Sequence, residues 1–353
     1  MNPVVTHQEF PVPTTPPPVS PRGTRAAAAL AAVLALMTLL TACGGDAGFA
    51  STSTGTTRVT IAGSDYLGGA PVYTATENGQ WAANGLTPQV QSFATGRDAL
   101  NAVLGGQAQY AVVGDLPAVS AVLAGRKIEI VAALSGFTDW RLFTTAAASV
   151  TRFADLKGKK IGLPEGTNVQ YALDGMLTAA GLKPGDVTLV NLAPNQVTAA
   201  LARGDIDAGL TFPSFYDATK AALGAEYREL RYTGYTYRTL LVAAPGTAAR
   251  TSTAVLRTLT TAAGTAAKDP AAARKAVVAQ AKGALQPGFV DAYYASYHYA
   301  VTLDEPLLKL LVAEGAWVKS TQKPAGTPDR ATFLQHIDPA PLKSAAPQAV
   351  TLS

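Results

Sequence analysis

The amino-acid sequence predicts an α/β protein built as two lobes. The chain has 353 residues, whereas one hydrophobic core rarely grows beyond about 250. From residue 58 onward, short apolar runs typical of strands alternate with amphipathic runs typical of helices. Hydrophobic residues make up 48% of the chain and charged residues 15%, a composition that favours a globular protein. Strands joined through helices at this spacing predict parallel βαβ units with right-handed crossovers.

Residues 1–43 have the features of an export signal. Arg22 and Arg25 precede an uncharged, apolar run over residues 26–40, and this run is shorter than the roughly 20 residues of a membrane span. A basic flank, an apolar segment and small residues before a cleavage point are typical of a secretory signal peptide. A proline-rich extension, residues 1–21, comes before the basic flank, and we assign it no function.

Cys43 is the only cysteine in the sequence, so a disulfide within the chain is excluded. Its context, Leu-Thr-Ala-Cys, resembles the lipobox of bacterial lipoproteins, and that resemblance implies that Cys43 is lipidated and becomes the first residue of the mature protein. The alternative is a cysteine that follows an ordinary signal peptide. Residues 44–57 are rich in Gly, Ser and Thr, which predicts a flexible tether.

Four strands and three helices are predicted between residues 58 and 134. Pro71 stands in the first turn of a helix and Gly79 at its end, a typical arrangement of helix termini. Thr95 and Asp98 form a capping pair at the start of the next helix. The predicted strands are 58–62, 87–93, 109–114 and 127–134, and the predicted helices are 70–79, 94–106 and 115–125.

A second series of strands and helices begins near Leu142. In its first helix, Thr167 and Gln170 match a capping box, and Gly181 ends the helix. The apolar residues of this helix share one face and predict a buried stripe, formed by Val169, Leu173, Met176, Leu177 and Ala180. The predicted strands lie within 156–164, 186–193 and 206–212, the helices are 167–181 and 194–205, and residues 213–218 are predicted as a loop.

The sequence after Tyr235 predicts one strand, residues 238–244, and then three or four helices. These helices are rich first in Ala and then in aromatic residues, as in the stretch 293–300. Because no further strong strand pattern follows, we expect these helices to pack against the first sheet. The predicted first lobe is therefore 58–135 and 238–353 and the second lobe 136–237, with the chain crossing between them near 134–146 and 230–240.

Ligands of parallel α/β sheets bind at the carboxyl ends of the strands, where loops meet helix N-termini. The loops at these positions are rich in small and hydrogen-bonding residues, so backbone amides can approach a ligand closely. Each loop alone is explained as an ordinary polar turn, but as a set facing one cleft they favour a small-molecule site. These loops are 63–69, 94–98, 114–117, 164–168 and 211–216.

Catalysis, metal binding and nucleic-acid binding find little support in the sequence. The three histidines are His7, His298 and His336, and no nucleophile elbow, zinc-protease motif or glycine-rich phosphate motif occurs. The net charge of +4 is small, and no Lys/Arg cluster tracks a phosphate backbone. We therefore expect neither an enzyme nor a cofactor, a metal or a nucleic-acid partner.

Asp65 and Asp115 follow two of the predicted strands. They form either a carboxylate pair across the cleft or, in the interpretation that we favour, hydrogen-bond acceptors and caps within their own loops. Tyr66 and Phe212 lie in loops of the same set.

Two segments resemble one protein family. Residues 94–134, which contain "ATGRDALNAVLGG" and "VVGDLPAVSAVLAG", and residues 155–208, which begin "DLKGKKIGLPEGTN", are similar to the aliphatic-sulfonate-, taurine- and nitrate-binding proteins of ABC importers. The similarity runs from about Val59 to Tyr216. It implies a two-lobed, periplasmic-binding-protein-like (type II) fold that closes at a hinge, with an ABC permease and its ATPase as partners.

The resemblance also implies which residues line the pocket. Phe212 and Pro213 would form its apolar wall, and the first turns of three helices would direct amides towards an acidic group. The segment "GLTFPSFY" lacks the acidic residue that relatives carry there, so that contact is not carried over. The other implied ligand-binding residues are Ser64, Asp65, Tyr66, Gly96, Arg97, Gly114, Asp115, Gly166, Thr167 and Asn168.

Arg97 and Thr167 each allow two roles. Arg97 occupies a position where many sulfonate binders carry proline, and it either clamps an anion or, as we favour, points to solvent from the first helical turn. Thr167 is expected both to cap its helix and to donate its hydroxyl proton to a ligand.

Together these patterns predict a monomeric receptor, lipid-anchored on the outer face of the cell membrane. It would capture a small organic anion, such as a sulfonate, taurine or a nitrate-like ion, and deliver it to the permease. One alternative is the same receptor for a thiamine-type pyrimidine or another neutral heterocycle, which Asp65, Asp115, Tyr66 and Phe212 would suit. Another is a sensor for a signalling partner. The remaining rival is a pyrimidine synthase, which needs internal His and Cys chemistry, whereas the mature chain would keep only its N-terminal Cys43.

Overall fold

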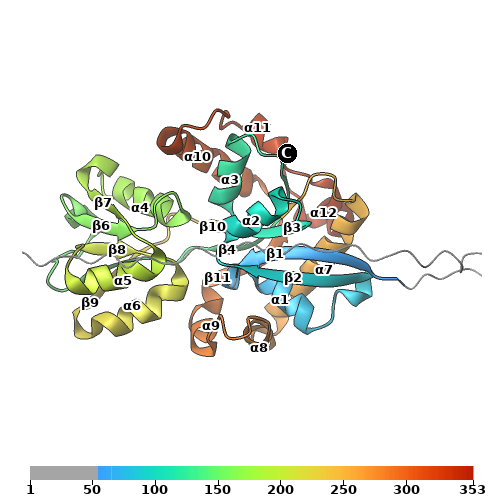
Figure 1. Ribbon diagram of the computed structural model, residues 1–353, viewed down its shortest axis with the longest axis horizontal. Helices are drawn as coiled ribbons and strands as arrows, with labels where there is room; N and C mark the ends of the chain where they lie inside the picture. Colours follow the sequence, from blue (N-terminus) through green and yellow to red (C-terminus); the bar gives the residue numbers. More distant parts are fainter. Residues whose placement is uncertain (1–54, 65, 353) are drawn as a thin grey trace, which may run out of the picture. The chain divides into compact units, whose positions relative to one another are not determined.

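The computed structural model describes residues 55–64 and 66–352. The export signal, Cys43, most of the tether and Asp65 lie outside the described residues. The described chain forms two lobes, each built around one β-sheet with helices on its faces (Figure 1). This arrangement confirms the predicted α/β class.

The first lobe contains a six-stranded sheet of order β11-β4-β10-β3-β1-β2. Strand β1 pairs in parallel with β2 and β3, as the βαβ pattern predicts. Strand β10 enters between β3 and β4 and runs antiparallel to both. The strands are β1 (Thr57–Ser64), β2 (Leu86–Phe93), β3 (Tyr110–Gly114), β4 (Glu129–Phe137), β10 (Tyr237–Ala243) and β11 (Tyr297–Thr302).

The second lobe contains a five-stranded sheet of order β7-β6-β8-β5-β9. Its inner strand β6 pairs in parallel with β7 and β8, whereas β5 runs antiparallel to β8 and β9. The chain passes between the sheets at residues 138–139 and 233–236. The strands are β5 (Trp140–Thr145), β6 (Lys160–Leu163), β7 (Thr188–Asn191), β8 (Ala208–Leu210) and β9 (Tyr227–Tyr232).

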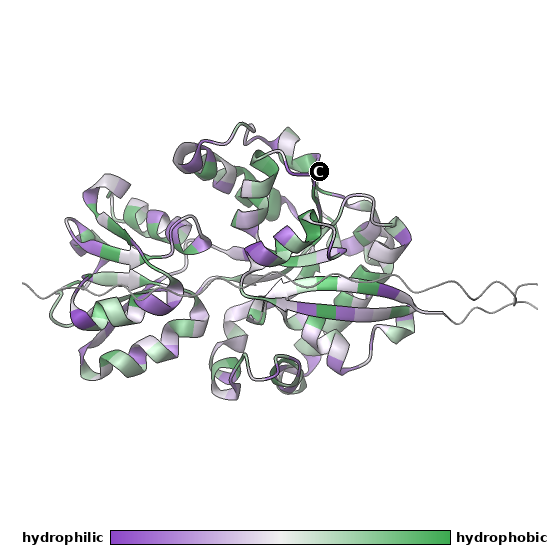
Figure 2. Cartoon of the chain, in the orientation of Figure 1, coloured by the Kyte–Doolittle hydropathy of each residue, from purple (hydrophilic) through white to green (hydrophobic). Residues whose placement is uncertain are grey.

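Twelve α-helices surround the sheets within the described residues. Hydrophobic residues lie on the strands and on the helix faces that meet them, and polar residues lie outward (Figure 2). The first lobe carries α1 (Ala70–Glu77), α2 (Gly96–Leu104), α3 (Asp115–Leu123), α7 (Ala249–Lys268), α8 (Pro270–Gln280), α9 (Pro287–Tyr293), α10 (Glu305–Gln322), α11 (Arg330–Leu334) and α12 (Ala340–Ala345), and the second carries α4 (Asn168–Ala179), α5 (Pro194–Arg203) and α6 (Tyr216–Leu223).

The predicted cap of α2 is confirmed, because the Thr95 hydroxyl accepts from the amide of Asp98 at 3.1 Å. At α4 the predicted capping box is wrong in its partners. The Thr167 hydroxyl accepts from the amide of Val169 instead of Gln170, and the Gln170 side chain accepts from the amide of Gly166 at 2.7 Å. The buried stripe of this helix is confirmed except at its last residue, Ala180, which is partly exposed.

Three other predictions are wrong. The aromatic stretch expected as a helix ends α9 at Tyr293 and then forms β11, an edge strand, because its Tyr, Val and Thr residues suit a pleated surface. Strands β5 and β9, which pair with each other in antiparallel fashion, had no predicted counterpart. The predicted loop 213–218 contains the start of α6.

No helix among the described residues combines the length and apolar character needed to cross a membrane.

A candidate ligand-binding cavity between the lobes

A cavity of about 440 Å³ lies between the two lobes, at the carboxyl ends of their parallel strands. In the first sheet β1 stands between β2 and β3, and in the second β6 stands between β7 and β8. Such switch points, where neighbouring connections leave in opposite directions, are where α/β sheets bind ligands. The lining residues are Ser64, Tyr66, Leu67, Ala94, Thr95, Gly96, Arg97, Gly114, Pro117, Phe137, Trp140, Pro164, Thr167, Asn168, Pro194, Phe212, Pro213, Ser214, Phe215, Tyr237, Phe289 and Tyr297.

Most of the residues expected at the pocket lie on the wall of this one cavity. Asp115 and Gly166 do not line it, although both contact residues that do. Asp65 lies outside the described residues. The predicted residues that line the cavity are Ser64, Tyr66, Gly96, Arg97, Gly114, Thr167, Asn168, Phe212 and Pro213.

Arg97 reaches from the first turn of α2 towards the second lobe. Its Nη2 donates a hydrogen bond of 2.9 Å to the carbonyl of Gly166, in the loop between β6 and α4. Arg97 is exposed, as the interpretation that we favour expects, and it is also one of the residues that line the cavity. Arg97 is the only charged side chain among the described lining residues.

Thr167 does not have a free hydroxyl proton. Its Oγ1 donates to the carbonyl of Pro164 at 2.7 Å and accepts from the amide of Val169 at 3.2 Å. A hydroxyl carries one proton and two lone pairs, so one lone pair remains in this arrangement. The expectation that Thr167 donates to a ligand is therefore wrong for this arrangement, in which it can only accept.

Asp115 is fully buried beneath the cavity wall and acts as an acceptor for several donors. Oδ1 accepts from Asn168 Nδ2 at 2.5 Å and from the Tyr235 hydroxyl at 3.1 Å. Oδ2 accepts from the backbone amide of Arg238 at 2.7 Å. Burial raises the pKa of the Asp115 carboxyl to about 6, and these hydrogen bonds limit the rise. Asp115 is thus a hydrogen-bond acceptor, as we favoured, but most of its donors lie on other elements and not in its own loop.

A second buried carboxyl, Glu314 of α10, faces the same tyrosine. The Tyr235 hydroxyl lies 2.8 Å from Glu314 Oε1 and accepts from Asn168 Nδ2 at 2.6 Å. A tyrosine has one hydroxyl proton, so it cannot donate to Asp115 and Glu314 at once. A proton on Glu314 completes the second hydrogen bond. Burial and the nearby Asp115 charge both raise the pKa of Glu314 well above its usual value, in agreement with this proton count.

Aromatic side chains that sequence analysis did not identify form much of the cavity wall. The ring centres of Phe137 and Tyr297 are 4.8 Å apart, and those of Phe137 and Trp140 are 5.5 Å apart. The Trp140 ring also meets Tyr237 edge-on at 6.3 Å. Phe289, from α9, completes this side. In the sequence, the density of aromatic residues near position 297 is the signal for this wall, and on its own it is equally typical of helix packing.

The hydroxyl of Tyr66 is buried at the cavity without a hydrogen-bond partner. Burial raises the pKa of Tyr66 to about 12. Tyr66 therefore remains protonated at neutral pH. A buried hydroxyl of this kind gains free energy from any ligand acceptor that reaches it.

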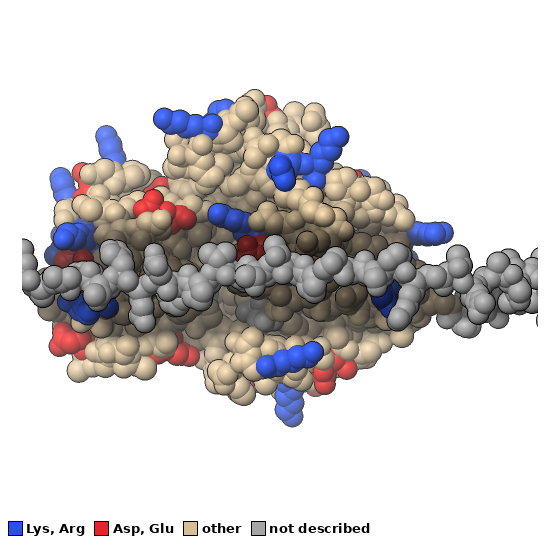
Figure 3. All heavy atoms as spheres, in the orientation of Figure 1, with Lys and Arg blue, Asp and Glu red and all other residues tan. Residues whose placement is uncertain are grey.

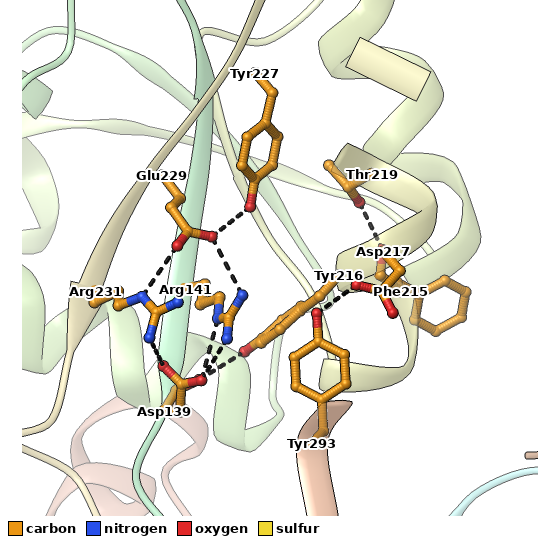
Figure 4. Close-up of polar contacts among 10 residues, drawn as sticks. All are labelled: Asp139, Arg141, Phe215, Tyr216, Asp217, Thr219, Tyr227, Glu229, Arg231 and Tyr293. Atoms are coloured by element: carbon orange, nitrogen blue, oxygen red, sulfur yellow. Dashed lines mark hydrogen bonds and ion pairs between the residues drawn. The ribbon is translucent and has the colours of Figure 1, made fainter. Parts of the chain in front are cut away.

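A polar cluster supports the wall on the α6 side of the cavity (Figure 4). The Arg141 guanidinium lies 5.1 Å from the ring centres of both Tyr216 and Tyr293, and it donates to Asp139 at 2.6 Å. The Tyr293 hydroxyl, at the end of α9, donates to Asp217 of α6 at 2.6 Å. This hydrogen bond connects α9, which precedes strand β11 of the first sheet, with α6 of the second lobe.

Charge elsewhere on the described surface is mixed. On the face drawn in Figure 3, Lys and Arg side chains are spread among Asp and Glu side chains over both lobes. Within residues 55–352, position 65 apart, no three His, Cys, Asp or Glu side chains are grouped so that they could hold a metal ion.

The chain matches known proteins over much of its length. The family model described as NMT1/THI5 like matches residues 68–286, more than half of the chain. A binding protein of Brucella abortus is 36% identical over 151 residues, which cover 42% of this chain and 46% of that protein. The taurine-binding periplasmic protein of Escherichia coli is 31% identical over 124 residues, 35% of this chain and 38% of that protein. The match thus spans less than half the length of these curated relatives.

Solved structures share the fold at low sequence identity. The periplasmic aliphatic sulphonate-binding protein of Escherichia coli has a TM-score of 0.67 at 20% identity, covering 80% of this chain and 92% of that one. The desulfurization enzyme DszB has a TM-score of 0.65 at 17% identity, covering 82% and 99%. These likenesses confirm the two-lobed fold, and they show that it carries both receptors and an enzyme. By its matching family model, the chain belongs to the NMT1/THI5-like family.

Proposed function

We propose that the protein is an extracytoplasmic receptor of an ABC importer, which binds a small organic anion in the cavity between its lobes and delivers it to the permease. The observation that carries this proposal is the position of Arg97, the one charged side chain on the described cavity wall, where its guanidinium bridges to Gly166 of the opposite lobe. An anion at this place would contact both lobes and favour their closed arrangement.

The relatives support this role. One is named as a taurine-binding periplasmic protein, and a solved protein of the same fold is named as a sulphonate-binding one. The lipobox-like sequence at Cys43 supports attachment to the membrane by a lipid. In this proposal the protein acts as a monomer beside its permease. A receptor role is also favoured over catalysis because no Cys, His, Asp or Glu is among the described lining residues.

A neutral heterocycle, such as a thiamine-type pyrimidine, is the second candidate ligand. It is favoured by the aromatic side chains around the cavity, since flat rings stack on such walls. A sensor role for the same site would share the ligand and differ only in the partner.

Calorimetric titration of the full chain, purified in detergent, tests the proposal with taurine, alkanesulfonates, arylsulfonates, nitrate, carboxylates and neutral pyrimidines. At least one organic anion is expected to bind with a micromolar or lower Kd, and Arg97→Ala is expected to weaken it by about tenfold or more. Arg126→Ala, which removes an exposed arginine outside the cavity, is the matched control. Binding of neutral pyrimidines alone would contradict the anion assignment.

A further inference from the structure

The composition of the cavity wall restricts the chemistry of the ligand further. Eight aromatic side chains line the cavity, against one cation. Nitrate carries no apolar group, and taurine carries only a short two-carbon link, for such a wall to shelter from water. Ligand pockets usually match apolar walls to apolar ligand surface, with a few polar groups that fix orientation. The eight are Tyr66, Phe137, Trp140, Phe212, Phe215, Tyr237, Phe289 and Tyr297.

The polar part of the wall is concentrated where two helices begin. Gly96 and Arg97 form the first turn of α2, and Asn168 begins α4. The first amides of a helix have no acceptor within it, and the positive end of its dipole favours a negative group. The hydrogen bond from Arg97 to Gly166 holds these two helix starts together.

The aromatic part of the wall is a separate, continuous surface. Phe137 contacts both Trp140 and Tyr297, and Trp140 contacts Tyr237. Gly114 lies where the two parts meet, because a Cβ placed there would be 2.7 Å from the Tyr237 ring and 3.2 Å from Asn168 Oδ1. Phe212 from the second lobe and Phe289 from α9 add rings to the wall.

The volume agrees with a ligand larger than taurine. A dry cavity of about 150 Å³ holds one benzene molecule, whereas this cavity measures about 440 Å³. It has room for an anionic head and a ring system together.

We propose that the ligand is an amphiphilic organic anion with an aromatic body, of the arylsulfonate or arylcarboxylate class. The anionic head lies against the first turns of α2 and α4 beside Arg97, and the ring lies against Phe137, Phe212 and Phe289. This inference rests on the proposed receptor function and narrows its ligand class.

Isothermal titration of the full chain in detergent tests the inference with four probes: naphthalene-2-sulfonate, methanesulfonate, taurine and the neutral naphthalene-2-sulfonamide. Naphthalene-2-sulfonate is expected to bind at least about 100-fold more tightly than methanesulfonate, because each buried CH2-sized group lowers Kd by about three- to fourfold. The sulfonamide is expected to bind at least about tenfold more weakly than the sulfonate, since it lacks the charge that Arg97 recognises.

The outcomes separate this inference from the proposed function. If methanesulfonate or taurine binds as tightly as naphthalene-2-sulfonate, the inference of an aromatic ligand body is overturned. The proposed function as a receptor for small anions then still holds. If the sulfonamide binds as tightly as the sulfonate, the proposal that the ligand carries an anionic head is overturned. Failure of every anion to bind at millimolar concentration counts against the receptor function itself.

Two variants localise the ring. Phe212→Ala and Phe289→Ala are each expected to weaken the binding of naphthalene-2-sulfonate by about tenfold or more. They are expected to change the affinity for methanesulfonate by less than about threefold. Both side chains are half-buried, so the protein is expected to fold without them. Phe153→Ala is the matched control, because this half-buried ring packs on Tyr232 away from the cavity. Equal losses in all three variants would contradict the placement of the ring.

Discussion

The side-chain amide of Asn168 donates a hydrogen bond of 2.5 Å to Oδ1 of Asp115. Asn168 begins α4 of the second lobe, and Asp115 begins α3 of the first. The contact is buried on both sides, and the same amide donates to Tyr235, which lies on one of the two segments that cross between the lobes. This contact between the lobes therefore supplies a donor that the Asp115 carboxyl would otherwise lose.

Replacing Asn168 by alanine is expected to weaken the closed arrangement. The variant leaves Asp115 buried with one donor fewer, which costs about 1–3 kcal/mol in the free energy of unfolding. Urea denaturation measures this loss, and small-angle scattering with and without ligand measures the degree of closure. Asn101→Ala, at an exposed position of α2, should change neither quantity. Unaltered stability and closure in the Asn168 variant would contradict this role.

Glu314→Gln is expected to stabilise the protein in a pH-dependent way. Burial raises the pKa of Glu314 in the folded state above its unfolded value, which is about 4.3. The contribution of such a group to stability is fully present below the unfolded pKa and is lost as pH rises through the folded pKa. Near pH 4 the variant should match the parent, and near pH 8 it should be more stable than the parent.

Chemical denaturation at a series of pH values measures this difference. The raised pKa of Asp115, about 6, has the same sign and remains in the variant, so some pH dependence persists. Glu226→Gln, at an exposed position, is the control. A stability difference between Glu314→Gln and the parent that does not change with pH would argue against a shared proton at Tyr235.

Gly114→Ala is expected to abolish ligand binding and lower stability. A Cβ at this position would lie 2.7 Å from Cε2 of Tyr237 and 2.9 Å from its hydroxyl, so the ring must move into the cavity. Overpacking of this kind typically costs about 1–3 kcal/mol. Thermal unfolding and ligand titration measure both effects. Gly185→Ala is the control, since a Cβ there meets nothing within 4 Å, and equal behaviour of the two variants would refute the close packing at Gly114.

Cys43→Ala is expected to release the protein from the membrane. The apolar run before this residue is too short to hold a chain in a bilayer stably, so attachment depends on the lipid. Fractionation of cells and labelling with a radioactive fatty acid measure the change. Continued membrane attachment of the variant without label would contradict the lipoprotein assignment.

Sequence patterns identified the loops of the site because these loops are local features. A strand, a turn of small or hydroxyl residues and a helix start are encoded within about ten neighbouring positions, as at Ser64–Tyr66, Thr95–Arg97 and Gly166–Asn168. The same reasoning failed for β11, whose aromatic residues fit a helix or a strand until a neighbouring strand is available to pair with them.

The sequence by itself determined the α/β alternation, the helix starts and the small residues that face the cavity, since each depends on residues close together in the chain. Only the tertiary structure decided which rings complete the wall, which carboxyl shares a proton with Tyr235, and which donor satisfies Asp115. Phe137 and Phe289 are far apart in the chain, and so are Asp115 and Glu314, and no local pattern marks that either pair comes together. The physical reason is that burial and hydrogen bonding depend on what surrounds a side chain in space.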